Sequence, residues 1–173
     1  DEKLIFGPDY NLSNYINSVT GRDMLLWNGG CHVHEKFSVE AIVKLKAEHP
    51  KAVVMAHLEC KAPVLAVADV KGSTATMLDY AKEHKETKKY IIATEARILH
   101  ELQRCCPDVT FYPVPPEVSE GGVGCSCNEC EYMKKNTLLK IYNTLRYELP
   151  EVTVDESIAK DAVKPIERML ELS

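Results

Sequence analysis

The feature that most constrains this chain is a regular alternation of short strand-like runs and helical segments over residues 3–114. The strand-like runs are 3–7, 23–27, 52–56, 70–72, 90–93 and 110–114, and helical patterns occupy 11–21, 38–49, 62–69, 76–84 and 95–106. No hairpin signal joins neighbouring strands, so right-handed βαβ crossovers and parallel pairing are expected. The sequence therefore predicts the α/β class, built from repeated small three-layer αβα units with short parallel sheets.

The pattern changes to helices alone from about Asn136. Helical periodicity covers 137–149 and 155–172. Proline lacks a backbone N–H and clashes with the preceding turn, so Pro165 is expected to interrupt the last helix or to begin its second half.

Charge and apolar pattern exclude two classes of partner. The net charge is −5, and lysines and arginines alternate with acids instead of forming a basic stripe, which argues against nucleic-acid binding. No apolar run approaches the length of a membrane span. The opening "DEKLIFGPDY" has no methionine and no signal-peptide layout, so we expect the chain to begin inside a larger, cytoplasmic protein.

The seven cysteines do not resemble a disulfide framework, because their number is odd and their spacing uneven. They stand at positions 31, 60, 105, 106, 125, 127 and 130. The stretch "GGVGCSCNECEYMKKNTL" (121–138) holds three of them. A zinc site there needs a fourth ligand, and no candidate stands nearby in the sequence, so a redox loop and chance composition remain open beside metal binding.

Polar side chains follow each strand-like run, where ligands gather in open α/β sheets. The residues that follow successive runs are Gly29, Gly30, Cys31, His32 and His34; His57, Glu59 and Cys60; Ser73 and Thr74; Thr94 and Glu95; and finally the cysteine loop. This concentration at one end of the sheet predicts a functional site.

Structural roles account for most of these residues when each is taken alone. A histidine at a strand end is more often hydrogen-bonded in the core, the reading we keep for His32, His49, His84 and His100. Ser-Thr before a helix is ordinarily a cap. Cys60, Cys105 and Cys106 fit small buried or helix-end positions, and Cys125 and Cys127 are expected to protect the loop or pair with each other.

Seven segments together resemble the carboxyl-terminal portion of the quinolinate synthase family. They are "IFGPDYNLSNY", "GGCHVHEKFSVE", "HLEC", "GSTATM", "ATEARIL", "CEYMKKNTL" and "IERMLEL", in the family's order and with its approximate spacing. The resemblance implies three α/β layers with pseudo-threefold symmetry in the complete enzyme. Residues 1–30 would end the middle layer, 31–120 would form a complete layer, and 121–173 would be the cysteine loop and carboxyl-terminal helices. The amino-terminal layer would be absent.

The resemblance also implies a 4Fe-4S cluster held by three cysteines, one from each layer. Cys31 and Cys130 match two ligands, and the third would lie in the missing part. The open iron would act as a Lewis acid in a transferase of NAD (pyridine nucleotide) biosynthesis. That enzyme condenses iminoaspartate with dihydroxyacetone phosphate to quinolinate, phosphate and water, with L-aspartate oxidase or aspartate dehydrogenase as the supplier of iminoaspartate.

Site residues carry over from the family position by position. His57 and Glu59 of "HLEC" match its acid–base and substrate-binding pair, and Leu58 stands where the family usually has proline, so the local turn can differ. Ser73 and Thr74 match substrate-anion contacts. His34 is expected to act as a substrate-binding or supporting group.

Two other functions fit the same residues. One is a non-catalytic zinc or thiol scaffold on the same fold. The other is an inactive fragment, since a chain with two of three cluster ligands is expected not to turn over by itself.

Overall fold

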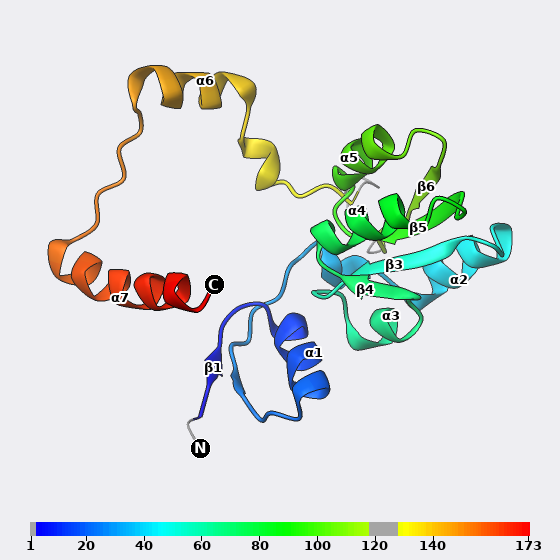
Figure 1. The fold of residues 1–173 in the computed structure, drawn as a ribbon, viewed down its shortest axis with the longest axis horizontal. Helices are drawn as coiled ribbons and strands as arrows, with labels where there is room; N and C mark the ends of the chain where they lie inside the picture. The colour runs from blue at the N-terminus through cyan, green and yellow to red at the C-terminus, as the bar shows by residue number, and fades with distance from the viewer. Residues whose placement is uncertain (1–2, 118–127) are drawn as a thin grey trace. The chain divides into compact units, whose positions relative to one another are not determined.

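Two parallel sheets organise the amino-terminal part of the chain in the computed structural model, which describes residues 3–117 and 128–173 (Figure 1). Contacts divide the chain into two compact units, Asp1–Glu131 and Tyr132–Ser173. The first unit contains both sheets, and the second is helical. Cys125 and Cys127 lie outside the described residues, so the expectation for them stays a prediction.

The smaller sheet pairs β1 (Ile5–Phe6) with β2 (Leu25–Leu26) in parallel, and α1 (Tyr10–Thr20) connects them. Asp9 caps this helix, because its Oδ1 accepts the backbone N–H of Leu12 at 2.9 Å. Gly21 ends the helix with a φ of 67°, a left-handed conformation that glycine adopts without steric cost.

The larger sheet has four parallel strands in the order β4-β3-β5-β6. The strands are β3 (Val53–His57), β4 (Val70–Gly72), β5 (Lys89–Ala93) and β6 (Thr110–Pro113). In the central pair Val53 lies beside Tyr90 and Ala56 beside Ala93. Parallel pairing with a helix after each of β3, β4 and β5 confirms the predicted α/β class and its short parallel sheets.

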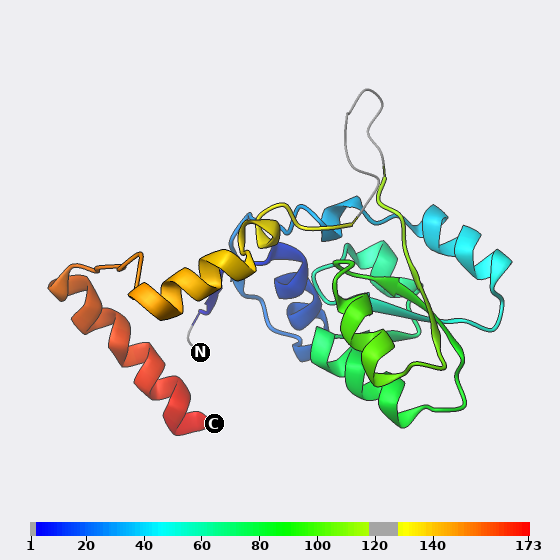
Figure 2. The same ribbon diagram turned by 90° about the horizontal axis from the view of Figure 1, so that it is seen from above.

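Helices cover both faces of the larger sheet, as two perpendicular views show (Figures 1 and 2). One face carries α2 (Val39–Glu48) and α3 (Ala62–Ala66), and the other carries α4 (Thr74–Glu83) and α5 (Ile98–Cys105). Successive strand side chains alternate between these faces: Val54 and Ala56 pack with the first pair of helices, and Met55 packs with the second. The unit is therefore a three-layer αβα sandwich whose strands are apolar on both sides.

Helix α5 begins later than its sequence pattern predicts. Residues 95–106 look helical throughout, yet the helix starts at Ile98. The preceding turn uses its backbone elsewhere: Glu95 accepts the N–H of Arg97 at 2.9 Å, and Ala96 donates to the carbonyl of Asn128 at 3.1 Å. These contacts replace the first turn that propensity alone favours.

The remaining helical elements are η1 (His34–Lys36), η2 (Met133–Lys135), α6 (Leu138–Tyr147) and α7 (Glu156–Leu172). The expectation for Pro165 is wrong, since α7 runs through it without interruption. Proline removes one hydrogen bond to the preceding turn, and the rest of this long helix retains its own. No helix within residues 3–117 and 128–173 is long and apolar enough to cross a membrane.

Close packing at the end of β4 gives the first prediction. A Cβ added at Gly72 would lie 2.5 Å from Cγ2 and 2.6 Å from Cβ of Thr76. Gly72→Ala should therefore lower the free energy of unfolding by about 1–3 kcal/mol, the range of overpacking. Chemical denaturation measures this, and the same change in a Thr76→Gly background should cost clearly less. Equal costs in both backgrounds would show that this contact is not responsible.

Candidate functional site

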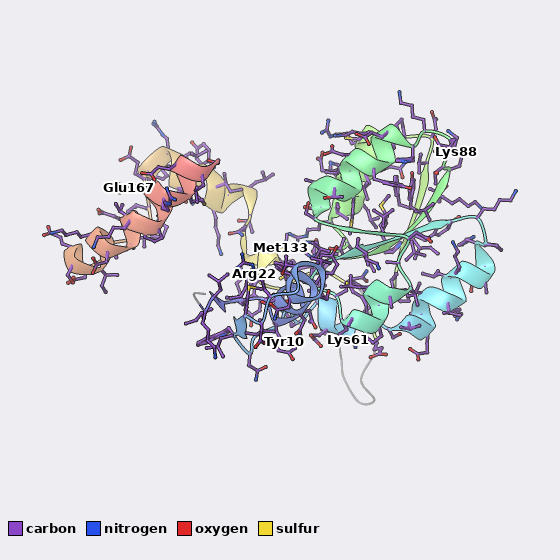
Figure 3. All side chains as sticks on the ribbon, turned by 60° about the horizontal axis from the view of Figure 1, so that its bottom comes forward. Tyr10, Arg22, Lys61, Lys88, Met133 and Glu167 are labelled. Atoms are coloured by element: carbon purple, nitrogen blue, oxygen red, sulfur yellow. The ribbon has the colours of Figure 1, made fainter. Side chains whose placement is uncertain are left out.

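The carboxyl ends of β3 and β5 lie side by side in the larger sheet. The chain leaves β3 for β4 on one side and returns to β5 on the other, which makes this the topological switch point where open α/β sheets bind ligands. His57 and Glu59 follow β3, and Thr94 and Glu95 follow β5. Two labelled residues in Figure 3 mark the two edges of the sheet. Lys61 lies in the chain just after β3, at the carboxyl edge, and Lys88 lies just before β5, at the opposite edge.

Two imidazoles and a carboxylate meet at this edge. His34 Nδ1 lies 3.1 Å from Glu59 Oε2, and His57 Nδ1 lies 4.0 Å from the same oxygen. The two rings stack with centroids 4.6 Å apart and an interplanar angle of 18°. Segment 31–37, through η1, thus brings His34 onto the turn that follows β3, although the sequence separates the two segments.

Burial keeps both imidazoles neutral at pH 7. It lowers the pKa of His34 to about 4, and at low pH a protonated His57 would act in the same direction. Burial also lowers the pKa of His57, against the opposing effect of the Glu59 carboxylate. A neutral imidazole can accept a proton, so each ring is suited to act as a base.

Hydrogen bonds orient the two rings. The backbone N–H of Glu59 donates to His57 Nδ1 at 3.3 Å, which leaves the proton of neutral His57 on Nε2. His34 Nε2 lies 3.0 Å from Thr94 Oγ1, a buried hydroxyl directly after β5. The site is therefore tied to both central strands.

Cys31 adds a thiol to this cluster. Its Sγ and one ligand atom each of His34 and Glu59 all lie within 4.8 Å of one another, close enough to share a cation. Its backbone N–H donates to Asp9 Oδ2 at 2.7 Å. Burial raises the pKa of the Cys31 thiol, so a metal would have to displace its proton.

Cys130 approaches the same region from the far side of the undescribed segment 118–127. Its backbone N–H donates to Glu95 Oε1 at 3.1 Å. Cys31 and Cys130 are both free, half-buried and packed against the same apolar cluster. A negative charge on Cys130 contributes to raising the pKa of Cys31, so the two sulfurs lie within electrostatic reach.

The other described cysteines have different surroundings. Cys60 is fully buried, its Sγ lies 3.4 Å from the carbonyl oxygen of Ala93, and burial raises its thiol pKa to about 12. Cys105 ends α5, and Cys106 packs on the second core cluster, on the opposite face of the sheet from Cys31.

The remaining predicted site residues lie at the same edge. Ser73 follows β4, and its Oγ accepts the N–H of Thr76 at 3.2 Å as the cap of α4. Thr74 begins that helix and is exposed. Leu58 is half-buried in the turn between His57 and Glu59.

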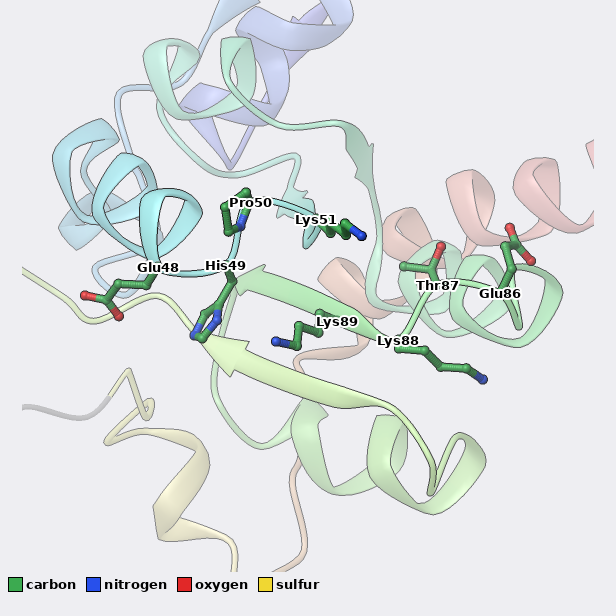
Figure 4. Close-up of a pocket in the computed structure, with 8 residues that line it drawn as sticks. All are labelled: Glu48, His49, Pro50, Lys51, Glu86, Thr87, Lys88 and Lys89. Carbon is green, nitrogen blue, oxygen red and sulfur yellow. The ribbon is translucent and has the colours of Figure 1, made fainter.

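A pocket of about 550 Å³ lies at the opposite edge of the sheet (Figure 4). Its lining residues are Glu48, His49, Pro50, Lys51, Glu86, Thr87, Lys88 and Lys89. These residues lie before β3 and at the start of β5, and none of the predicted site residues is among them. His49 stacks on Tyr112 with ring centroids 3.8 Å apart, in keeping with a packing role.

Sequence reasoning placed Glu95 and the cysteine loop at this edge, but it missed Asp9 and gave no role to Asn128. Asp9 carries only the signal of a helix cap, and Asn128 lies in the cysteine loop. Asn128 is buried, and its Nδ2 has no hydrogen-bond partner among the described residues. Hydrogen bonds between residues 95–96 and 128–130 join segments that are distant in the chain, so no local sequence pattern could predict them.

Fold and donor set together define a class: an α/β protein with thiol, imidazole and carboxylate donors at the carboxyl edge of a parallel sheet. Comparison with known proteins makes the assignment specific. A family model described as "Quinolinate synthetase A protein" matches residues 1–171. The chain belongs to the quinolinate synthase family.

Relatives named quinolinate synthase agree with that assignment. Those from Microcystis aeruginosa and Nostoc punctiforme are each 45% identical to this chain, over 172 and 173 residues. The relative from Chloroherpeton thalassium is also 45% identical, over 173 residues. These alignments cover 99–100% of this chain and 52% of each relative, so the chain spans about half their length.

The buried imidazole of His34 gives the second prediction. As the pH falls from 6.5 towards 4, the unfolded chain takes up a proton at residue 34 that the folded chain excludes. The free energy of unfolding should then fall by up to about 3 kcal/mol between pH 6.5 and pH 4. Above pH 6.5 this loss is absent, because residue 34 is neutral in both the folded and the unfolded chain.

Denaturation of metal-free protein measures this effect against His34→Gln, which lacks the titrating group. The stability advantage of the unmodified chain over the variant should shrink as the pH is lowered. An advantage that grows instead would show that Glu59 holds a protonated imidazole as an ion pair.

Proposed function

We propose that this chain is part of a quinolinate synthase, which condenses iminoaspartate with dihydroxyacetone phosphate to quinolinate, phosphate and water in NAD biosynthesis. One observation carries the proposal. The free thiols of Cys31 and Cys130 pack on one apolar cluster, and Cys31 adjoins the His34–Glu59–His57 network. Family membership supports the same chemistry.

The proposed cofactor is a 4Fe-4S cluster with Cys31 and Cys130 as two of its ligands. The donor set fits, because thiolates are the usual ligands of such clusters and both thiols are free and partly shielded from water. A third thiolate is proposed to come from the part of the enzyme outside this chain. When bound, the cluster would supply a Lewis acid at the iron that no protein ligand occupies.

The chain's own residues would bind substrate and move protons. His57 and His34 are held neutral, so either can accept a proton, and Glu59 lies within 4.0 Å of both imidazoles to receive or return one. Ser73, Thr74 and the backbone N–H groups that begin α4 are proposed to bind a substrate anion. Leu58 would line the same site.

The wider assignment is also proposed. Residues 1–30, 31–120 and 121–173 would be the end of one layer, a complete layer, and the cysteine loop with the carboxyl-terminal helices of a pseudo-threefold enzyme. The chain by itself would be inactive, since it offers two of three ligands. The enzyme would work in the cytoplasm, with iminoaspartate supplied by L-aspartate oxidase or aspartate dehydrogenase.

A zinc or thiol scaffold is the second candidate. The close grouping of Cys31, His34 and Glu59 favours it, because sulfur, imidazole and carboxylate donors together suit zinc. Anaerobic purification separates the two candidates. Brown protein with acid-labile sulfide supports the cluster, whereas colourless protein with stoichiometric zinc supports the scaffold.

The third prediction concerns the cluster ligands. In the complete enzyme, Cys31→Ala or Cys130→Ala should abolish stable cluster assembly, because each removes one of three thiolates. Cys60→Ala is the matched control and should retain the cluster, since that thiol is committed to the core. Iron and sulfide analysis after anaerobic reconstitution decides the matter. If Cys130→Ala keeps a full cluster and Cys127→Ala loses it, the ligand in this loop is Cys127 and the assignment of Cys130 is wrong.

The fourth prediction concerns the acid–base pair. His57→Ala and Glu59→Gln should each lower turnover at least about a hundredfold, the scale of general acid–base help. The visible spectrum of the cluster should stay unchanged in both variants. His49→Ala, at the opposite edge of the sheet, serves as the control and should keep normal turnover. Near-normal turnover in a His57 or Glu59 variant would leave that residue with a structural role.

A further inference from the structure

Two carboxylates hold the backbones of the two thiol-bearing residues at this edge. Asp9 Oδ2 accepts the N–H of Cys31 at 2.7 Å, and Glu95 Oε1 accepts the N–H of Cys130 at 3.1 Å. The partners are 22 and 35 residues apart in sequence, so both bonds are tertiary contacts. Each candidate ligand is thus fixed by a carboxylate from a different segment of the fold.

The Asp9 carboxylate is buried, with 6% of the residue exposed, and it uses both oxygens. Oδ1 caps α1 through the N–H of Leu12, and Oδ2 binds Cys31. Gly30 precedes Cys31, and a Cβ there would lie 3.6 Å from Oδ2, an ordinary van der Waals distance. A helix cap needs one oxygen only, so the bond to Cys31 is additional.

The Glu95 side chain is 13% exposed and also uses both oxygens. Oε2 accepts the N–H of Arg97 at 2.9 Å while Oε1 binds Cys130. The neighbouring N–H of Ala96 donates to the carbonyl of Asn128. The turn after β5 therefore binds the segment 128–130 through two hydrogen bonds. Because residues 95–97 adopt this turn, α5 begins only at Ile98.

We propose that Asp9 and Glu95 are paired positioning residues for the metal centre. Each fixes the main chain of one cysteine by accepting its N–H. The fixed main chain should favour assembly. Each carboxylate also adds negative charge at this edge of the sheet, which should lower the reduction potential, because a less negative net charge raises it.

This inference rests on the proposed function, since it takes Cys31 and Cys130 as ligands. The underlying bonds can be tested without a metal. Asp69 provides a matched control: its Oδ2 accepts the N–H of Val54 at 2.8 Å, but it contacts no cysteine in the described hydrogen bonds.

The variants are Asp9→Asn, Glu95→Gln and Asp69→Asn. Asparagine is an equally good N-cap, so Asp9→Asn can keep α1 capped while it turns an N–H donor towards Cys31. Amide hydrogen exchange in the metal-free complete enzyme reports each bond directly. The midpoint potential of the loaded enzyme reports the effect on the cluster.

We expect exchange at Cys31 to quicken about tenfold or more in Asp9→Asn, with little change at Cys130, as for a lost hydrogen bond to a charged group. Glu95→Gln should show the reverse selectivity. Both variants should raise the midpoint potential, and Asp69→Asn should change neither quantity.

The inference is wrong if the amide exchange rate at Cys31 is unchanged in Asp9→Asn. It is also wrong if the midpoint potential of the loaded Asp9→Asn or Glu95→Gln enzyme stays the same or falls. Equal quickening at both cysteines in Asp69→Asn would overturn it as well, because it would reduce the effect to general destabilisation. A complete unmodified enzyme that binds no cluster refutes the proposed function instead. The exchange measurements would then still decide whether these carboxylates hold the two segments.

Discussion

Parallel pairing of β3 with β5 is the constraint on which the rest of the structure depends. Every backbone bond of this pair is made between segments far apart in the chain, and the apolar side chains on both faces need a helix layer on each side. The chain leaves β3 for β4 on one side and β5 for β6 on the other, and the residues that follow both strands reach the same edge. The position of the polar cluster is therefore a consequence of strand order.

Burial gives this cluster its chemical character. Removal from water disfavours the charged form of an imidazole or a thiol. The two histidines therefore stay neutral, and the Cys31 thiol keeps its proton. The neutral imidazoles can therefore accept protons, whereas the thiol must lose its proton before it can bind a metal ion. Hydrogen bonds offset part of the desolvation cost of the imidazoles: His34 bonds with the Thr94 hydroxyl, and His57 accepts the backbone N–H of Glu59.

Much of the fold and part of the site could be predicted from the amino-acid sequence alone. The alternation of apolar runs and helical periodicity places each strand found in residues 3–117 and 128–173, because side-chain spacing directly reflects local geometry. His57, Glu59, Ser73 and Thr74 could be assigned to one edge because they follow predicted strands. Helix α5 and Pro165 departed from expectation, since tertiary contacts and a long helix outweigh local preferences.

The sequence by itself determined the α/β class, the parallel sheets and the family to which the chain belongs. Only the tertiary structure decided that His34 stacks on His57, that Thr94 meets His34, and that separate carboxylates hold Cys31 and Cys130. The physical reason is the range of the interactions. Periodicity records which face of an element is buried, whereas a hydrogen bond between distant segments depends on strand order and loop paths that no local pattern encodes.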